Sequence, residues 1–516
     1  MENFTIELGS NAGNAFLNAL TDETNYTYTE NGAITHKTTK SALLDMFALC
    51  GAYRNRSDED CILAFKKALQ ENEAYAMKCL FYLRDVRGGQ GERRFFRVCL
   101  NWLANYYSAA VVRNMQYIAE YGRWDDYYCL VGTPLEEDMF KFLKEQITLD
   151  FECKTPSLLA KWLKSENASS PKTKYLGAKT RAAFGMSHKQ YRKTLSMLRE
   201  RINVLERLMS AGKWDEIEFD KIPSRAGLIY KNAFARRDII KKKYEEFAKS
   251  ENTKVNAEVL NPVDIAERIF NISGWGCRNQ YDSFSDTDIA MYQKYWDNLK
   301  DYYNGRQENG LAIVDTSGSM WGRPLCAAVS MGAYIAERGH GPFANHFISF
   351  SEKPSLINFD GVDICDKFFR CIEADWGMST NLEGVFNLML TTAIKNKTVQ
   401  ADMPDTLYIF SDMEFNHCID CHDSDGNRWS RHRTTEDEIN TLLERIAEQW
   451  ARYGYHIPKV IFWNLDARHQ NIPAIGPGFS YVSGFSMNMI EQILSGKDGY
   501  DLMMEKLNTE RYSPIH

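Results

Sequence analysis

The stretch that decides the fold is Leu311 to Met320, which reads LAIVDTSGSM. Four apolar residues lead directly into Asp315, and Ser317 and Ser319 follow at two-residue spacing. A short apolar run that ends in small polar residues is typical of a buried parallel strand that enters a loop. Ligands bind at this end of such strands, and one carboxylate with two hydroxyls suits a hard cation such as Mg²⁺. The stretch therefore predicts an α/β domain with a metal site at one edge of its sheet.

Two further stretches extend this site. Asp405 to Asp412 reads DTLYIFSD, a second apolar strand with an aspartate at its carboxyl end, and Met378 to Asn381 reads MSTN, a polar loop that starts a helix. The set resembles the metal-ion-dependent adhesion site (MIDAS) of von Willebrand factor A domains, which has a DxSxS motif, a distant Thr and a distant Asp. By position, the resemblance implies that the metal ligands are Asp315, Ser317, Ser319, Thr380 and Asp412.

The same resemblance implies a bound divalent cation, Mg²⁺ or another such as Mn²⁺ or Ca²⁺. It also implies that the open position on the metal accepts an acidic group from a protein partner. The alternative interpretation is that DTSGSM is only a strand–loop–helix turn.

Length and composition limit the class of protein. A chain of 516 residues is long enough for two or three domains, and 44% hydrophobic residues indicate a globular protein. There is no run of eighteen apolar residues, so we expect no membrane span. The first residues, MENFTIELGSN, lack the pattern of a signal peptide, and the twelve cysteines are scattered as buried free thiols are. We therefore expect a cytoplasmic protein.

Charge is distributed unevenly along the chain. The net charge is −7, yet residues 154–249 contain 23 Lys and Arg against 10 Asp and Glu. A basic block in an acidic chain predicts a surface that binds a polyanion. The alternative is a solvated helical face that pairs with acidic residues elsewhere in the chain.

The first half of the chain has the periodicity of short helices. Residues 1–40 are polar and aperiodic, and we expect a lead-in there; from Ser41 onward, apolar residues recur at three- and four-residue spacing. Ser57, with Asp60 three residues later, predicts a helix start, whereas Asn167–Lys174 (NASSPKTK) indicates a basic loop. Short helices joined by short turns predict a solenoid or ring of HEAT-like repeats over residues 41–300.

Three segments of this half carry a second resemblance. They are Tyr82–Arg97 (YLRDVRGGQGERRFFR), Tyr121–Asp126 (YGRWDD) and Pro223–Asp238 (PSRAGLIYKNAFARRD). Followed by an A-type domain, they resemble the Ro autoantigen and the telomerase/Ro/vault (TROVE) module proteins, and more closely an uncharacterised Ro-like family of plants, microbes and viruses.

The Ro resemblance implies a monomeric ring of helical repeats closed by the A domain. In Ro proteins the central hole takes single-stranded 3′ ends of RNA, and a basic outer face binds small structured RNA. We therefore expect a ribonucleoprotein component, with RNA contacts chosen by charge and position. The candidates are Arg87, Arg93, Arg94, Lys174, Lys179, Arg181, Lys189, Arg192, Arg225, Lys231, Arg236 and Arg237.

The second half alternates strands and helices over residues 301–516. After LAIVD we expect strands near residues 344–350, 356–359, 407–410 and 459–464, with helices between them and a final helix over Asn488–Leu507. This alternation predicts a doubly wound, mainly parallel sheet of the Rossmann-like, von Willebrand A type.

One segment of this half offers a different metal. His417, Cys418, Cys421 and His422 lie close enough in sequence to bind zinc, although the usual second ligand pair is missing. The alternative is a solvated loop that shapes access to the predicted metal site.

The motifs favour binding over catalysis. The chain has no Walker loop, no GxSxG elbow and no HExxH motif. We therefore expect an RNA-binding protein that is not an enzyme. The alternative is a metal-dependent protein–protein adaptor without RNA binding. A third class, a metallophosphoesterase, would need the metal to activate water.

Overall fold

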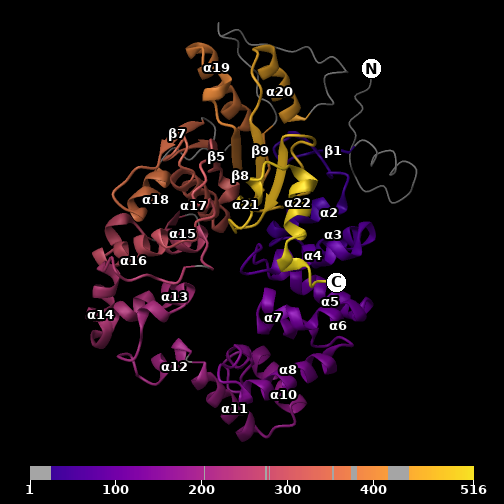
Figure 1. Cartoon of the computed structure of the whole chain (residues 1–516), viewed down its shortest axis with the longest axis vertical. Coiled ribbons are helices and arrows are strands. Elements are labelled where there is room, and N and C mark those ends of the chain that lie inside the picture. The colour runs from indigo at the N-terminus through magenta and orange to yellow at the C-terminus, as the bar shows by residue number, and fades with distance from the viewer. Residues whose placement is uncertain are drawn as a thin grey trace.

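The structure is a computed structural model that describes residues 25–202, 204–257, 259–273, 276–277, 279–350, 354–373, 380–416 and 441–516. Short helices fill the first half, and a mainly parallel sheet with helices forms the second (Figure 1). We call the helices α2 to α16 the helical arc and the part from β5 onward the α/β domain. The expected order, a helical region before an α/β domain, is therefore observed.

The helical arc consists of helices of four to seventeen residues. Its members are α2 (Ala42–Leu49), α3 (Asp58–Glu71), α4 (Glu73–Arg84), α5 (Arg94–Tyr106), α6 (Ser108–Asn114), α7 (Ile118–Tyr121), α8 (Glu136–Glu152), α9 (Leu159–Trp162), α10 (Pro171–Ala183), α11 (His188–Arg201), α12 (Leu205–Ser210), α13 (Ser224–Arg236), α14 (Asp238–Lys249), α15 (Pro262–Phe270) and α16 (Asp286–Asp297). A short hairpin, β3 (Ile272–Ser273) with β4 (Gly276–Cys277), lies between α15 and α16.

Local capping explains where several of these helices begin. Ser57 caps α3 through a capping box with Asp60, as the sequence predicts. The expectation of a loop over residues 167–174 is wrong in its second half, because Ser170 caps α10 and Pro171 is its first residue. Proline is favoured at that position since its missing N–H would have no helical partner there.

The α/β domain contains a six-stranded sheet. Its strands are β5 (Gly310–Asp315), β6 (His346–Phe350), β7 (Ser355–Asn358), β8 (Thr406–Ser411), β9 (Lys459–Asn464) and β10 (Phe479–Ser483). The order across the sheet is β10-β9-β8-β5-β6-β7, and only β7 runs antiparallel to its neighbour. The chain moves outward from β5 to one edge and then from β8 to the other, so the strand order reverses between β5 and β8. This is the doubly wound arrangement, and its ligand position is the crevice between those two strands.

Helices and one hairpin complete this domain. The helices are α17 (Arg323–Arg338), α18 (Ile364–Glu373), α19 (Leu382–Asn396), α20 (Leu442–Arg452), α21 (Ile490–Ile493) and α22 (Gly499–Leu507). The single helix expected over Asn488–Leu507 is therefore two helices, and Gly496 between them has a φ of +80°. Near the start of the chain, β1 (Tyr26–Tyr28) and β2 (Ile34–His36) form an antiparallel hairpin that reaches the α/β domain through backbone bonds between His36 and Ile472.

Both ends of the helical arc pack on the α/β domain. At the first end, α2 packs against β10 and α22, and Arg511 Nη2 donates to Asp85 Oδ1 at 2.7 Å. At the second end, α15 packs against α17, and α16 packs against α18. The arc therefore leaves the α/β domain and returns to it, with α8 to α12 farthest from the sheet (Figure 1).

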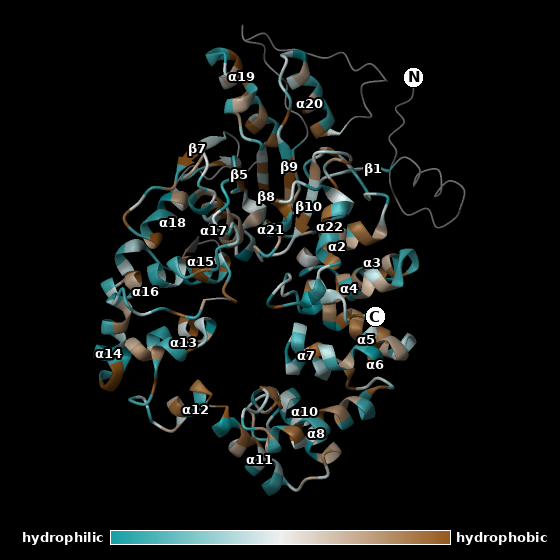
Figure 2. Cartoon of the chain, in the orientation of Figure 1, coloured by the Kyte–Doolittle hydropathy of each residue, from teal (hydrophilic) through white to brown (hydrophobic). Residues whose placement is uncertain are grey.

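The core follows the hydropathy of the elements. β8 is buried at all six of its positions, and β5 and β9 are buried at five of six. Figure 2 shows hydrophobic residues along β9 and β10 and hydrophilic residues along outer helices such as α3 and α16. Cys50, Cys79, Cys99 and Cys326 are buried free thiols, as expected. Among the described residues, no helix is both long and apolar enough to cross a membrane.

Candidate metal site and cationic surface

The carboxyl ends of β5 and β8 meet at the point where the strand order reverses. Asp315 is the last residue of β5, and its side chain is fully buried. Ser411 ends β8, and its hydroxyl donates to Asp315 Oδ2 at 2.5 Å. Asp412 follows directly and is also buried. The topology thus brings two aspartates, about a hundred residues apart in the sequence, to one position.

The loop after β5 gathers the two serines around Asp315. The backbone N–H of Ser317 donates to Asp315 Oδ1 at 2.9 Å, and the hydroxyl oxygens of Ser317 and Ser319 are 3.0 Å apart. Ser317 is buried and Ser319 is exposed. The cluster of oxygen donors therefore extends from the buried strand end to the surface.

Two other segments contact this position. Asp412 Oδ1 accepts from the Glu414 N–H at 3.1 Å, and Asp412 Oδ2 accepts from Arg468 Nη2 at 2.7 Å. Thr380 is buried, and its carbonyl accepts from the N–H of Asn416, four residues past Asp412, at 3.0 Å. The structure thus brings Asp315, Ser317 and Ser319 together with Asp412 and places Thr380 beside the segment that follows Asp412.

The electrostatics of the two aspartates suit a cation. Burial, and then the nearby charge of Asp412, raise the pKa of Asp315 to about 7. Arg468 supplies one positive charge to this pair of buried carboxylates. A divalent ion would compensate the second carboxylate, and carboxylate and hydroxyl oxygens are the donors that Mg²⁺, Ca²⁺ and Mn²⁺ prefer. The five residues therefore fit a divalent metal. The histidines and cysteines at residues 417–422 lie outside the described residues.

The twelve cationic candidates fall into two groups. Five form ion pairs inside the chain: Arg94 with Asp58, Lys179 with Glu136, Arg181 with Glu166, Arg225 with Asp264 and Lys231 with Asp288. Two have other contacts, since Arg87 donates to the Glu120 carbonyl and Arg237 lies over the Trp214 ring. Five are exposed and form no ion pair with any described residue: Arg93, Lys174, Lys189, Arg192 and Arg236.

Cations from the outgoing limb of the helical arc (α2 to α11) and the returning limb (α12 to α16) lie near enough for their charges to affect one another's pKa. Burial, and then the charges of Arg84 and Arg225, lower the pKa of Arg123, and Arg93 acts in the same direction. Burial is also the largest cause of the lowered pKa of Lys164, to which Arg93 contributes, whereas Asp125 raises the pKa of both Arg123 and Lys164. Arg93, Arg123 and Lys164 belong to the outgoing limb and Arg225 to the returning one. We call these four residues the inner cationic cluster.

Sequence reasoning missed two members of this cluster, Arg123 and Lys164. Each lies against an aromatic ring: Arg123 is 5.1 Å from the centre of Trp162, and Lys164 is 5.2 Å from the centre of Tyr128. A signal was present, because Arg123 is part of the YGRWDD segment and Lys164 follows Trp162 by two residues.

A cavity of about 590 Å³ lies at the far point of the arc, between α9, α11 and α12. Its wall includes four cations (Lys161, Arg192, Arg199 and Arg207) and the buried Tyr191. Arg199 donates to the carbonyls of Ala160 and Leu163 and so closes the end of α9. Arg192 remains exposed at this cavity.

These features define a class of protein: a helical arc that returns to a doubly wound α/β domain, with a cation-type oxygen cluster where the strand order reverses. Residues 29–147 and 152–302 match the family described as "Domain of unknown function (DUF2828)", and residues 309–513 match "Domain of unknown function (DUF7788)". The chain belongs to the DUF2828 family.

Two known proteins are similar to this chain. "Uncharacterized protein L728" of Acanthamoeba polyphaga mimivirus is 31% identical over 519 residues, which cover 92% of this chain and 85% of that protein. The crystal structure of the Deinococcus radiodurans RO (RSR) protein aligns over 92% of this chain and 100% of that one, with 11% identity and a TM-score of 0.36. A structural likeness at that score carries no argument about function.

Proposed function

We propose that this chain binds single-stranded RNA through the inner cationic cluster. The observation that carries the proposal is that Arg93 and Arg225, from opposite limbs of the arc, both act on Arg123, and that Arg93 also acts on Lys164. Two of the four lie against partly exposed aromatic rings. Cations that can contact phosphate, next to rings on which bases can stack, are the combination that binds single strands without sequence preference.

Exposed cations on α10 and α11 support binding of structured RNA. Lys174, Lys189 and Arg192 lie on α10 and α11, are exposed, and form no ion pair with a described residue. Like-charged residues without acidic neighbours attract a polyanion more strongly than paired ones do, because no internal pair has to be broken.

We also propose that Asp315, Ser317, Ser319, Thr380 and Asp412 hold a divalent cation, Mg²⁺ or another such as Mn²⁺ or Ca²⁺. The support is the pair of buried aspartates, for which Arg468 is the one ion-pair partner among the described residues. When bound, the ion supplies an open coordination position to a carboxylate. The exposed Ser319 marks the side from which an acidic group of a protein partner would approach.

The proposal is for a monomeric, cytoplasmic RNA-binding protein rather than an enzyme. The arc returns to the α/β domain of its own chain, so no second copy is needed to close it. The alternative is an adaptor that captures an acidic partner at the metal and binds no RNA. The exposed Ser319 at the edge of the oxygen cluster favours that alternative. Removal of the metal distinguishes the two functions, because it would abolish binding of an acidic partner and leave RNA binding intact.

The salt dependence of RNA binding tests the inner cluster. For single strands, log K falls with log salt by about 0.7 for each phosphate contacted. Arg225 is paired with Asp264, so the other three cations of the cluster predict a slope of about −2 for a fluorescent oligouridine. Arg93→Gln with Arg123→Gln should weaken binding at least tenfold and reduce the slope by about 1.4.

The matched control removes the same charge elsewhere in the basic block. Lys242 and Lys249 are exposed on α14, outside the inner cluster. The Lys242→Gln/Lys249→Gln variant should bind like the parent. Equal loss in both double variants would show that net charge, not the inner cluster, governs binding.

A further inference from the structure

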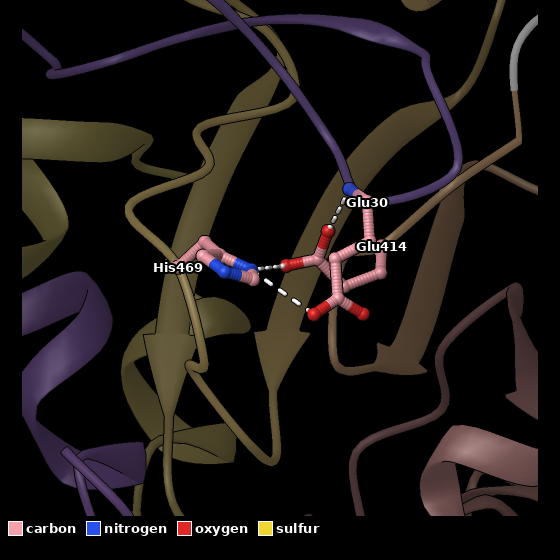
Figure 3. A group of neighbouring side chains, drawn as sticks. All are labelled: Glu30, Glu414 and His469. Carbon is pink, nitrogen blue, oxygen red and sulfur yellow. Dashed lines mark hydrogen bonds and ion pairs between the residues drawn. The ribbon is translucent and has the colours of Figure 1, made fainter. Parts of the chain in front are cut away.

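A second group of possible metal ligands lies beside the oxygen cluster, and only one of its three members comes from a segment that also contributes to that cluster. Glu30 lies between β1 and β2, Glu414 follows β8, and His469 follows β9 (Figure 3). One ligand atom of each lies within 4.8 Å of those of the other two. The three side chains point toward one another (Figure 3).

The distances between these ligand atoms are close to those around a bound ion. His469 Nδ1 is 3.0 Å from Glu414 Oε1 and 3.7 Å from Glu30 Oε1. Nitrogen and oxygen ligands bind an ion such as Zn²⁺ at about 2.0–2.2 Å, so adjacent ligand atoms in a complex lie about 3.0–3.5 Å apart. Little movement of these side chains is therefore needed to place an ion between them.

The backbone and neighbouring side chains hold the three ligands in place. The Glu30 N–H donates to Glu414 Oε2 at 2.7 Å, and Asn471 Nδ2 donates to Glu414 Oε1 at 2.8 Å. Thr29 Oγ1 donates to the Phe415 carbonyl at 2.6 Å, which fixes the hairpin turn against the segment after β8. A preorganised group of this kind binds a metal more tightly than mobile side chains do.

The carboxylates around this group also favour a bound cation. Arg468 donates to Asp412 Oδ2 at 2.7 Å and lies 2.9 Å from Glu30 Oε2. One guanidinium thus pairs with two carboxylates, those of Glu30 and the buried Asp412, while the buried Glu414 lies beside them. Glu30 Oε1 faces His469 Nδ1, on the side where the ion would bind.

We propose that Glu30, Glu414 and His469 form a second divalent-metal site, specific for a first-row transition ion such as Mn²⁺ or Zn²⁺. An imidazole with two carboxylates suits these ions, whereas Mg²⁺ and Ca²⁺ prefer all-oxygen ligands. The side chains of Glu30 and His469 are 43% and 49% exposed, so water can complete the coordination. The ion would fasten the β1–β2 hairpin to the ends of β8 and β9.

Pulsed electron paramagnetic resonance with Mn²⁺ as the probe tests this site on the full chain. A histidine nitrogen bound to Mn²⁺ gives a ¹⁴N modulation, whereas the oxygen ligands at Asp315 and Ser317 give none. The parent should show the modulation, and His469→Gln should lose it. Glu30→Gln should weaken Mn²⁺ binding at least tenfold. Because both residues are exposed, both variants should keep the circular dichroism spectrum of the parent.

Three controls separate this site from other sources of the signal. His456→Gln changes an exposed histidine elsewhere in the α/β domain and should keep the modulation. A His417→Gln/His422→Gln variant and Asp315→Ala should also keep it. Absence of the modulation in the parent, or its persistence in His469→Gln, would overturn the proposal.

Discussion

Neutralising Asp126 should destabilise the helical arc more than any surface substitution. Asp126 Oδ2 accepts from Arg84 Nε at 2.9 Å and from the Arg123 N–H at 2.8 Å, and Asp126 Oδ1 accepts from Arg97 Nε at 2.6 Å. The side chains of Arg84 and Asp126 are 1% and 0% exposed. Asp126→Asn keeps the size and shape of the side chain but removes its negative charge, so the buried guanidinium of Arg84 loses its ion-pair partner.

Removal of one partner from a buried ion pair costs about 3–5 kcal/mol, and we expect a loss in that range for Asp126→Asn. Urea denaturation followed by far-ultraviolet circular dichroism measures the free energy of unfolding. The matched control is Glu246→Gln, because Lys242 and Glu246 are 89% and 69% exposed and 4.0 Å apart. That variant should lose at most about 0.5 kcal/mol. A loss below about 1 kcal/mol for Asp126→Asn would refute the reasoning.

Three further predictions follow from buried charges elsewhere. Arg511→Gln should cost about 2–3 kcal/mol in urea denaturation, because Asp85 is fully buried and accepts hydrogen bonds from Arg511 Nε and Nη2; an unchanged midpoint would contradict this role in closing the arc. Burial lowers the pKa of Lys506 to about 8 in the folded chain, against 10.5 ordinarily, so the unfolded chain holds more protons between those values. The free energy of unfolding of the parent, minus that of Lys506→Met, should therefore rise as pH increases from 8 toward 10.5. A difference that does not change with pH would argue against a lowered pKa for Lys506. Mg²⁺ at about 100 times its Kd should stabilise the parent by about 2.7 kcal/mol in thermal denaturation and leave the stability of Asp315→Ala unchanged. Equal stabilisation of both proteins would show that the ion binds elsewhere.

The oxygen cluster could be predicted because its signals are local. Apolar runs mark β5 and β8, and each ends at a polar residue that the structure places at the strand's carboxyl end. Right-handed crossovers and short connections then leave few ways to order the strands. Asp315 and Asp412 meet for that reason, although no residue near either one in the sequence indicates the other.

The cationic surface could not be predicted from charge alone. Arg225 pairs with Asp264, 39 residues away, and Lys231 pairs with Asp288, 57 residues away. Basic composition indicates the block but not which of its cations are already paired, because tertiary packing decides that. Arg93 is exposed and has no ion-pair partner in the part of the chain that the structure describes, yet it has the same sequence signal as Arg94, which pairs with Asp58.

The Glu30 site depends on contacts that no local pattern contains. The β1–β2 hairpin is short and polar, and it is held by bonds such as that from Thr29 Oγ1 to the Phe415 carbonyl, 386 residues away. Strand β10 was missed as well, although the structure places it at the sheet edge beside β9. Short strands of mixed polarity form where neighbouring strands provide a partner, which sequence periodicity does not reveal.

The central claim is that this protein binds RNA, and purification without nuclease tests it most directly. The parent and the Arg93→Gln/Arg123→Gln variant would be purified in parallel at low salt, their 260/280 nm absorbance ratios recorded, and any nucleic acid extracted and sequenced. We predict RNA with the parent and much less with the variant. A parent free of nucleic acid that also fails to bind added single strands at low salt would contradict the account and favour the adaptor function.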